Sequence, residues 1–214
     1  MPTTLYLIRH GETDYNRRRI VQGRRINSQL NETGRRQAEA LARRFASVPV
    51  EAFYSSTLRR AEETADIVAA QHPGVPVFRV EDLEEMSWGI FEGQPATEAW
   101  DEAYASMRES WERGDYTPRW EGGESILEVQ ERGVRAVRQI AQRHPGDTVV
   151  VVTHGRFLRV ILASLLTEIG LDRMDELSHG NTCVNQLAFE NDRVEAVLLN
   201  CTAHLDEITT ELVE

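Results

Sequence analysis

The stretch LYLIRHG at residues 5–11 decides the fold that we expect, because a short apolar run ends there in a charged turn that contains a histidine. A second stretch, VVVVTHG at residues 149–155, repeats the same order of features. Continuous apolar runs without alternation are typical of parallel strands that are covered on both faces. The sequence therefore predicts two buried strands, with His10 at the end of the first and His154 at the end of the second.

Weaker strand patterns and helical periods alternate along the rest of the chain. We expect further strands at residues 52–54, 75–80, 184–189 and 194–199, and helices over residues 33–45, 58–70 and from 125 onward. This alternation favours an α/β fold with a mostly parallel central sheet flanked by helices. The length favours a single domain over residues 1–214. Residues 81–131, rich in acids and tryptophans, predict a small, partly helical insertion that packs over one edge of the sheet as an acidic lid above the site.

The composition excludes several classes of protein. The net charge of −11 argues against a general nucleic-acid partner. The chain has no apolar run of about 18 residues, so no membrane partner is expected, and no basic leader precedes the first strand, which predicts a cytoplasmic location. Two cysteines and six histidines without metal-ligand spacing give no metal signature. No GxGxxG or GxxxxGK[ST] motif occurs, which disfavours dinucleotide enzymes and P-loop kinases.

The paired histidines suggest a chemistry. Ligands of open α/β sheets bind outside the carboxyl ends of the strands, so two neighbouring strands would bring His10 and His154 to one crevice. A neutral imidazole attacks phosphorus as a nucleophile. A second imidazole, when protonated, stabilises the phosphoryl oxygens in the transition state. Arginines of the first quarter outside this region, Arg19 among them, are expected to lie on solvated helix faces.

Four segments resemble the motifs of the histidine phosphatase (phosphoglycerate mutase-like) superfamily. They are LIRHGETDYN at residues 7–16, SSTLRRAEETA at 55–65, LEEMSWGIFEG at 83–93 and THGRFLR at 153–159. The matches run in the family's order and span residues 5 to about 205, nearly the whole chain. Each motif alone is modest, but four in order identify the chain as similar to that family.

The resemblance implies roles for individual residues. His10 becomes the phosphohistidine, and Arg9, Arg60 and His154 complete a cationic pocket around the phosphoryl group. Glu85 protonates the leaving-group oxygen and then activates water. Further phosphate or substrate contacts are implied for three loop residues, namely Asn16, Gln22 and Gly23. Three or four cationic donors neutralise a phosphomonoester of about two charges without a metal, so no cofactor is expected. A homodimer is an expectation at the level of the family.

The function predicted from these residues is a metal-independent phosphomonoesterase that acts on a small phosphorylated metabolite. A phosphoglycerate mutase-type transfer is the alternative, and residues 81–131 weigh against it because this segment is short, acidic and free of lysine. A non-catalytic module that binds phosphorylated ligands is a second alternative. It is disfavoured because every motif residue with an implied catalytic role is present. We also expect the acidic insertion to repel polyphosphates such as phytate.

Overall fold

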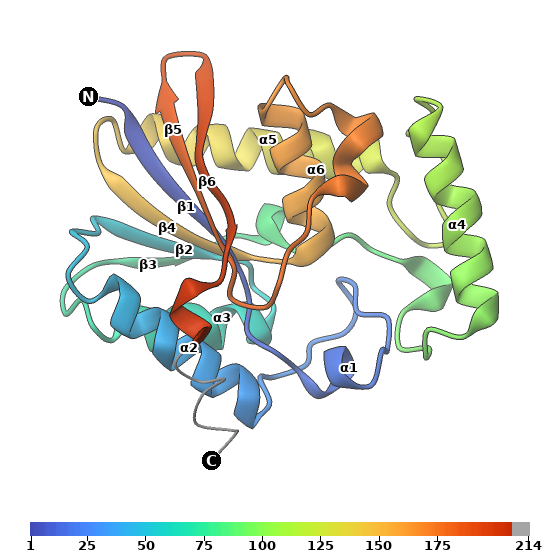
Figure 1. The fold of residues 1–214 in the computed structure, drawn as a ribbon, viewed down its shortest axis with the longest axis horizontal. Helices are drawn as coiled ribbons and strands as arrows, with labels where there is room; N and C mark the ends of the chain where they lie inside the picture. The colour runs from blue at the N-terminus through green and yellow to red at the C-terminus, as the bar shows by residue number, and fades with distance from the viewer. Residues whose placement is uncertain (207–214) are drawn as a thin grey trace.

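A six-stranded sheet in the order β3-β2-β4-β1-β5-β6 organises the computed structural model, which describes residues 1–206 (Figure 1). The strands are β1 (Thr3–Arg9), β2 (Ala52–Ser55), β3 (Val77–Arg79), β4 (Thr148–Thr153), β5 (Val184–Glu190) and β6 (Arg193–Cys201). The α-helices are α1 (Asp14–Arg17), α2 (Glu32–Phe45), α3 (Arg59–Ala69), α4 (Glu98–Glu112), α5 (Ile126–Arg143) and α6 (Gly155–Leu165). Short 3-10 helices are η1 (Glu81–Leu83), η2 (Gly89–Phe91), η3 (Leu171–Glu176) and η4 (Ala203–Leu205).

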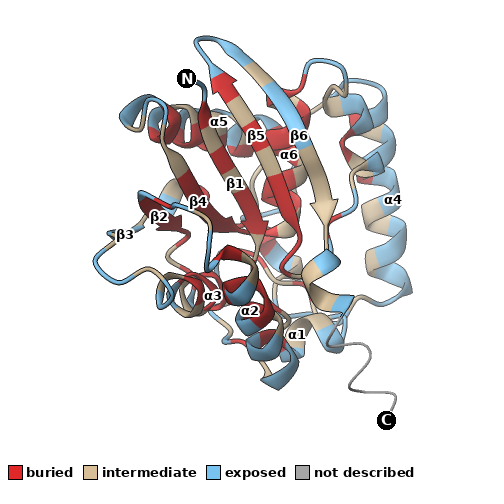
Figure 2. Ribbon diagram, turned by 60° about the vertical axis from the view of Figure 1, so that its left-hand side comes forward, coloured by how far each residue is buried: buried red, intermediate tan, exposed pale blue. Residues whose placement is uncertain are grey.

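The two strands predicted first, β1 and β4, are parallel neighbours at the centre of the sheet. Leu7 and Val151 pack in the core beneath α5 and α6, whereas Ile8 and Val152 pack toward α2 and α3 on the opposite face. All four side chains are almost fully buried, and Figure 2 shows buried stretches along both strands. Burial of each such side chain contributes about 1.5–3 kcal/mol. Both strands therefore lack a polar face, which explains their unbroken apolar sequence.

The expected mostly parallel sheet is confirmed. Strands β3, β2, β4 and β1 run parallel, while β5 and β6 form an antiparallel hairpin beside β1. The predicted helices at residues 33–45 and 58–70 correspond to α2 and α3 within one residue at each end. Strand β3 is shorter than predicted, and its side chains are partly or fully exposed because it forms an edge of the sheet.

Two glycines bring the turn after β1 against the start of α2. A Cβ atom on Gly11 would lie 2.5 Å from the carbonyl oxygen of Gly34, and one on Gly34 would lie 2.1 Å from that of Glu12. Asn31, the N-cap of α2, donates its side-chain amide to the Glu12 carboxylate at 2.7 Å. The backbone that follows His10 is thereby fixed to a helix end.

The segment 81–131 contains η1, η2, α4 and the first turn of α5, in agreement with the predicted partly helical insertion. Its rings form one cluster with centroids 5.1–6.2 Å apart, made by Trp88, Phe91, Trp100, Tyr104, Trp111 and Trp120. The main helix–helix contact of α4 is with η3, rather than with a sheet edge as the sequence predicted. In the described part of the chain no helix has the length and apolar character needed to cross a membrane.

Candidate active site

The site lies where β1 and β4 end side by side. Arg9 pairs in register with Thr153, and the backbone N–H of His10 donates to the Thr153 carbonyl at 2.9 Å. The ring centroids of His10 and His154 are consequently 5.1 Å apart. The two His-Gly turns meet at one crevice, as expected if their strands are neighbours.

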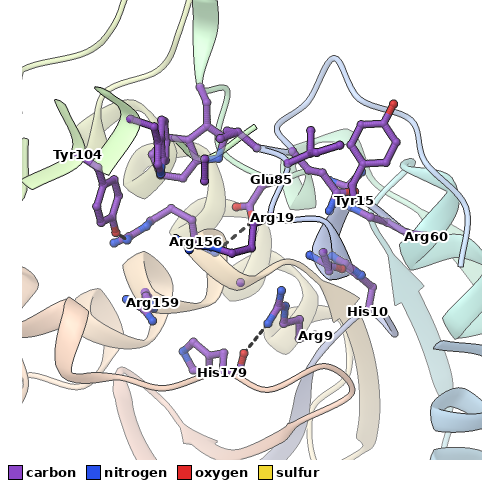
Figure 3. Close-up of a pocket in the computed structure, with 18 residues that line it drawn as sticks. Arg9, His10, Tyr15, Arg19, Arg60, Glu85, Tyr104, Arg156, Arg159 and His179 are labelled. Atoms are coloured by element: carbon purple, nitrogen blue, oxygen red, sulfur yellow. Dashed lines mark hydrogen bonds between the residues drawn. The ribbon is translucent and has the colours of Figure 1, made fainter. Parts of the chain in front are cut away.

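His10 is held in one tautomer. Its Nδ1 lies 2.7 Å from the carbonyl oxygen of Gly11, and a carbonyl can only accept, so Nδ1 carries the proton and Nε2 carries the lone pair. Burial, followed by the positive charges of Arg60 and Arg9, lowers the pKa of His10 well below 6.5. The imidazole is therefore neutral at neutral pH and lines the pocket as a candidate nucleophile (Figure 3).

Arg9 and Arg60 contribute buried cations beside His10. Arg9 donates Nη1 to the His179 carbonyl and Arg60 donates Nη1 to the Ile26 carbonyl, each at 2.6 Å. The Nε of both guanidinium groups is buried and has no hydrogen-bond partner among residues 1–206. Desolvation lowers both pKa values, that of Arg60 to about 10, which leaves it cationic at neutral pH. Buried donors without acceptors need a ligand, and phosphate oxygens suit guanidinium groups.

His154 lies behind the pocket. Its side chain is fully buried, and its Nε2 lies 2.8 Å from Ser56 Oγ, whereas Nδ1 has no partner in the part of the chain that the structure describes. Burial, followed by the charge of Arg60, lowers the pKa of His154 well below 6.5. The ring is therefore neutral in the unliganded protein, whereas the sequence-based expectation concerns a protonated ring in the transition state. The cause is the low-dielectric site itself, which penalises a third buried positive charge.

Glu85, which follows η1, places its carboxylate against the first backbone N–H groups of α6. Its Oε1 accepts from the backbone N–H groups of Met86 at 2.9 Å and Phe157 at 2.8 Å, and its Oε2 accepts from that of Arg156 at 3.1 Å. The carboxyl group is 7% exposed and lines the pocket. These three backbone N–H donors fix the position and orientation of the carboxyl group at the wall of the pocket.

One guanidinium holds the segment that carries Glu85. Arg132 of α5 donates Nη1 to the carbonyls of Asp82 at 3.0 Å and Glu84 at 2.8 Å, and Nη2 to that of Glu85 at 3.0 Å. Its Nε donates to the Glu124 carboxylate at 2.8 Å, and the residue is 7% exposed. No motif pointed to Arg132, because a single arginine within an amphipathic helix has no distinguishing pattern.

The implied contacts Asn16 and Gln22 both line the pocket. Asn16 Oδ1 accepts from the backbone N–H of Thr13 at 3.1 Å, and Gln22 Oε1 accepts from Ser28 Oγ at 2.6 Å. The oxygens of both amides are thus engaged, while their NH2 groups have no acceptor within residues 1–206. These NH2 groups are available as neutral donors to a ligand.

Gly23 lies one layer behind the pocket and is not among its lining residues. Its carbonyl accepts from Arg60 Nη2 at 3.4 Å, so its contact is with a cation of the site rather than with the cavity. A Cβ atom at this position would lie 2.8 Å from the backbone carbonyl oxygen of Met86, which explains the need for glycine. The geometry fits a supporting role for Gly23 beside Arg60.

The family model of the histidine phosphatase superfamily (branch 1) matches residues 5–202. The chain belongs to this superfamily. Metal-independent phosphoserine phosphatase of Arabidopsis thaliana is 40% identical over 164 residues, which are 74% of this chain and 67% of that protein. Phosphoglycerate mutase-like protein 4 of the same plant is 32% identical over 208 residues, 95% of this chain and 87% of that protein. A crystal structure of phosphoserine phosphatase from Entamoeba histolytica in complex with 3-phosphoglyceric acid has a TM-score of 0.82 at 26% identity, covering 95% and 99% of the two chains. The predicted enzyme class, a histidine-dependent phosphatase, is confirmed.

The pocket of this histidine phosphatase has a volume of about 390 Å³ and includes residues that the sequence did not assign. They include Arg19, Trp100, Tyr104, Arg156, Arg159 and His179. Arg156 and Arg159 lie in the first turns of α6, which begins where β4 ends. This placement is the signal that could have found them, since ligands bind at the carboxyl ends of such strands. Arg19 is not confined to a solvated helix face as expected, because it lines the pocket while it pairs with Asp101 at 3.6 Å.

The charge of the pocket corrects another expectation. Five arginines line it, against Glu85 as the one acid among the lining residues of the described chain. Other acids of the insertion form ion pairs outside the cavity. Glu84 and Glu124, for example, pair with Arg24 at 2.7 and 3.5 Å. The insertion contributes mainly rings to the cavity wall, so repulsion of polyphosphates by an acidic lid does not follow. Among residues 1–206 no group of three or more His, Cys, Asp or Glu side chains is arranged to hold a metal ion.

Proposed function

We propose that this phosphatase hydrolyses a small phosphomonoester in two steps, with His10 as the nucleophile and Glu85 as the acid and then the base. In the first step the Nε2 lone pair bonds to phosphorus while the P–O bond of the ester breaks, and the leaving oxygen takes a proton from Glu85. In the second step Glu85 takes a proton from water. The water oxygen bonds to phosphorus, the bond from phosphorus to Nε2 breaks, and inorganic phosphate is released.

The observation that carries this proposal is the state of His10. The Gly11 carbonyl fixes the proton on Nδ1 at 2.7 Å, and the lowered pKa keeps Nε2 free of a proton at neutral pH. A histidine with a purely structural role would need neither a fixed tautomer nor a position in a pocket lined by cations. A nucleophile that attacks phosphorus needs both conditions.

The anion is held by a mixed set of donors. Arg9 and Arg60 offer buried Nε–H groups that lack an acceptor among residues 1–206, and these would neutralise a phosphoryl group of about two charges. Asn16 and Gln22 offer neutral NH2 donors from the opposite loop. His154, neutral in the free enzyme, would take up positive charge only when the phosphoryl group is present, since a nearby anion raises the pKa of an imidazole.

Glu85 supports both proton transfers from one position. It lies in the pocket with His10, and the three N–H groups that it accepts keep its carboxylate from rotating away. In the first step Glu85 gives its proton to the leaving oxygen from this position. Transfer of the phosphoryl group to His10 and departure of the leaving group then restore the carboxylate that is needed as base.

The substrate class is a small phosphorylated metabolite. A cavity of about 390 Å³ lies within the usual range of about 300–1,000 Å³ for small-molecule sites. The relatives named for phosphoserine phosphatase, one of them bound to 3-phosphoglyceric acid, support this size class. Both cysteines, Cys183 and Cys201, are free thiols, which fits the reducing cytosol where we propose that the enzyme acts.

A mutase-type transfer is the second candidate, favoured by the similarity to phosphoglycerate mutase-like protein 4. In that reaction a bound phosphorylated acid, rather than water, accepts the phosphoryl group from His10. The insertion weighs against it, since the residues that it contributes to the cavity include no cation. They are Glu85, Trp88, Ala96, Trp100 and Tyr104.

The test is phosphate release from a panel of phosphomonoesters in the presence of a metal chelator. We expect turnover by the wild type and by His72→Ala, a control histidine outside the pocket, but none by His10→Ala. Interconversion of phosphoglycerates without phosphate release would identify the mutase. Tight binding without either reaction would identify a binding module, and activity retained by His10→Ala would refute the mechanism.

A further inference from the structure

We propose that Arg156, Arg159 and His179 form a second anion subsite that binds a carboxylate of the substrate, so that the enzyme selects phosphorylated small acids. This inference rests on the proposed function, because the phosphoryl group has to lie at His10. Figure 3 shows the three side chains on the part of the pocket away from His10 and Arg60. The contacts of each residue support this assignment.

Arg156 provides a buried donor without an acceptor. The residue is only 7% exposed, and its Nη1 has no hydrogen-bond partner among residues 1–206 although it lines the cavity. Its Nη2 pairs with Asp175 at 2.8 Å and with the hydroxyl of Tyr104. The guanidinium carbon also lies 5.1 Å from the ring centroid of Trp111. These contacts fix the guanidinium group in place. Nη1 remains a donor without an acceptor among the described residues, and an acceptor atom of a ligand would satisfy it.

His179 provides a second such donor. Its Nε2 is buried without a partner in the described chain, while its Nδ1 lies 3.8 Å from Cys183 Sγ. Burial raises the pKa of the Cys183 thiol to about 11, so the S–H is present and can donate to Nδ1. In the tautomer that accepts this S–H, Nε2 carries the ring proton and faces no acceptor in the described chain. Burial and the charges of Arg159, Arg9 and Arg156 lower the pKa of His179 to about 3, so the ring is neutral.

The charges of the subsite match one carboxylate. Arg156 and Arg159 share the single carboxylate of Asp175, at 2.8 and 2.6 Å, which leaves one uncompensated positive charge beside the cavity. Arg108 also reaches Asp175, at 3.3 Å, but it is exposed and does not line the pocket. A carboxylate carries one negative charge, and its two oxygens suit the fork of a guanidinium group. A second phosphate, with about two charges, would exceed what the subsite neutralises.

The experiment compares esters that differ only in the carboxylate. O-phosphoserine and O-phosphoethanolamine share the phosphate, the ammonium group and the two-carbon chain, and 3-phosphoglycerate and glycerol 3-phosphate form a second pair. We expect the wild type to prefer the acid of each pair by about 10- to 100-fold in kcat/KM, as expected for hydrogen bonds to a charged group. This arm requires no variant and therefore does not depend on the folding of a mutant.

Arg159→Gln tests the subsite directly, because this side chain is 28% exposed and its loss is less disruptive than that of Arg156. The acid preference should fall by about tenfold. Arg108→Gln is the matched control, since it removes another guanidinium from Asp175 without removing a pocket donor. It should keep the preference of the wild type.

Four results overturn the proposal. Equal turnover of both esters in each pair refutes the subsite while the proposed function stands. Equal losses for both esters in Arg159→Gln, or a bisphosphate preferred to O-phosphoserine, also refute the assignment to a carboxylate. Failure of every ester to release phosphate refutes the proposed function, and the subsite proposal falls with it.

Discussion

Arg132 should determine both the stability of the enzyme and the position of Glu85. Arg132→Met removes the donors to three backbone carbonyls, those of Asp82, Glu84 and Glu85, and leaves the Glu124 carboxylate without its 2.8 Å partner. The arginine and glutamate side chains are 8% and 16% exposed. Removing one member of a buried ion pair costs about 3–5 kcal/mol. We expect the free energy of unfolding to fall by about that amount.

The same change should lower kcat in the protein that remains folded. Displacement of a catalytic group by about 1 Å costs up to about 100-fold in rate. Arg135→Met is the matched control, because Arg135 lies about one turn away on α5, is 48% exposed and forms exposed ion pairs with Asp82 at 3.0 Å and Glu131 at 4.0 Å. Exposed pairs of this kind contribute about 0–1 kcal/mol, so this variant should keep its kcat.

Urea denaturation gives the stability difference, and initial rates in buffer without urea give kcat for the folded enzyme. The reasoning is refuted if Arg132→Met unfolds at the same urea concentration as Arg135→Met and has the same kcat. A loss of stability without a change in kcat would show that Arg132 supports the fold but does not position Glu85.

Four further predictions concern the reaction, the pH dependence of stability and the turn after β1. Glu85→Gln should lower kcat on alkyl phosphates by about 100- to 10,000-fold. The leaving group of p-nitrophenyl phosphate needs no proton, so with this ester only the second step should be slow, and stopped-flow absorbance should show a burst of one nitrophenolate per enzyme. The absence of a burst would contradict the role of Glu85. The pKa of His10 lies well below 6.5, so its titration should leave kcat/KM unchanged as the pH falls through 6.5 and should lower kcat/KM only at a pH well below that value. A loss of kcat/KM from titration of His10 at or above pH 6.5 would be inconsistent with this lowered pKa. The unfolded chain binds protons at His10 and His154 at a higher pH than the folded protein does, because folding depresses both pKa values. The free energy of unfolding should therefore be highest above pH 6.5 and decrease as the pH falls below 6.5, which thermal melts at several pH values can check. Gly34→Ala would place a Cβ atom 2.1 Å from the Glu12 carbonyl oxygen and should cost about 1–3 kcal/mol, whereas Thr33→Ala, on the exposed side, should cost less in the same thermal melt.

The central part of the fold could be predicted from the sequence because burial on both faces of a strand leaves an unbroken apolar run. Strands β1 and β4 carry that pattern, and each ends in a His-Gly turn, so the pairing of His10 with His154 followed from their adjacency. The capping box at Ser125 also located the start of α5 from local chemistry alone.

The second half of the pocket could not be predicted because its residues have no local pattern. Arg156 lies in the cavity through tertiary contacts with Asp175 and the rings of the insertion, which are separated from it in sequence. The charge on His154 likewise depends on burial and on Arg60, neither of which a motif reveals. Composition misled in the insertion for the same reason, since acids such as Glu84 and Glu124 pair with Arg24, which lies outside the pocket.

The most direct test of the account is to trap the phosphorylated enzyme. Wild-type protein mixed with a 32P-labelled ester and quenched in alkali, which preserves phosphohistidine, should carry label on the peptide that contains His10. His10→Ala should carry none. Phosphate release by the wild type without label on that peptide, together with release by His10→Ala, would contradict a phosphohistidine intermediate at His10.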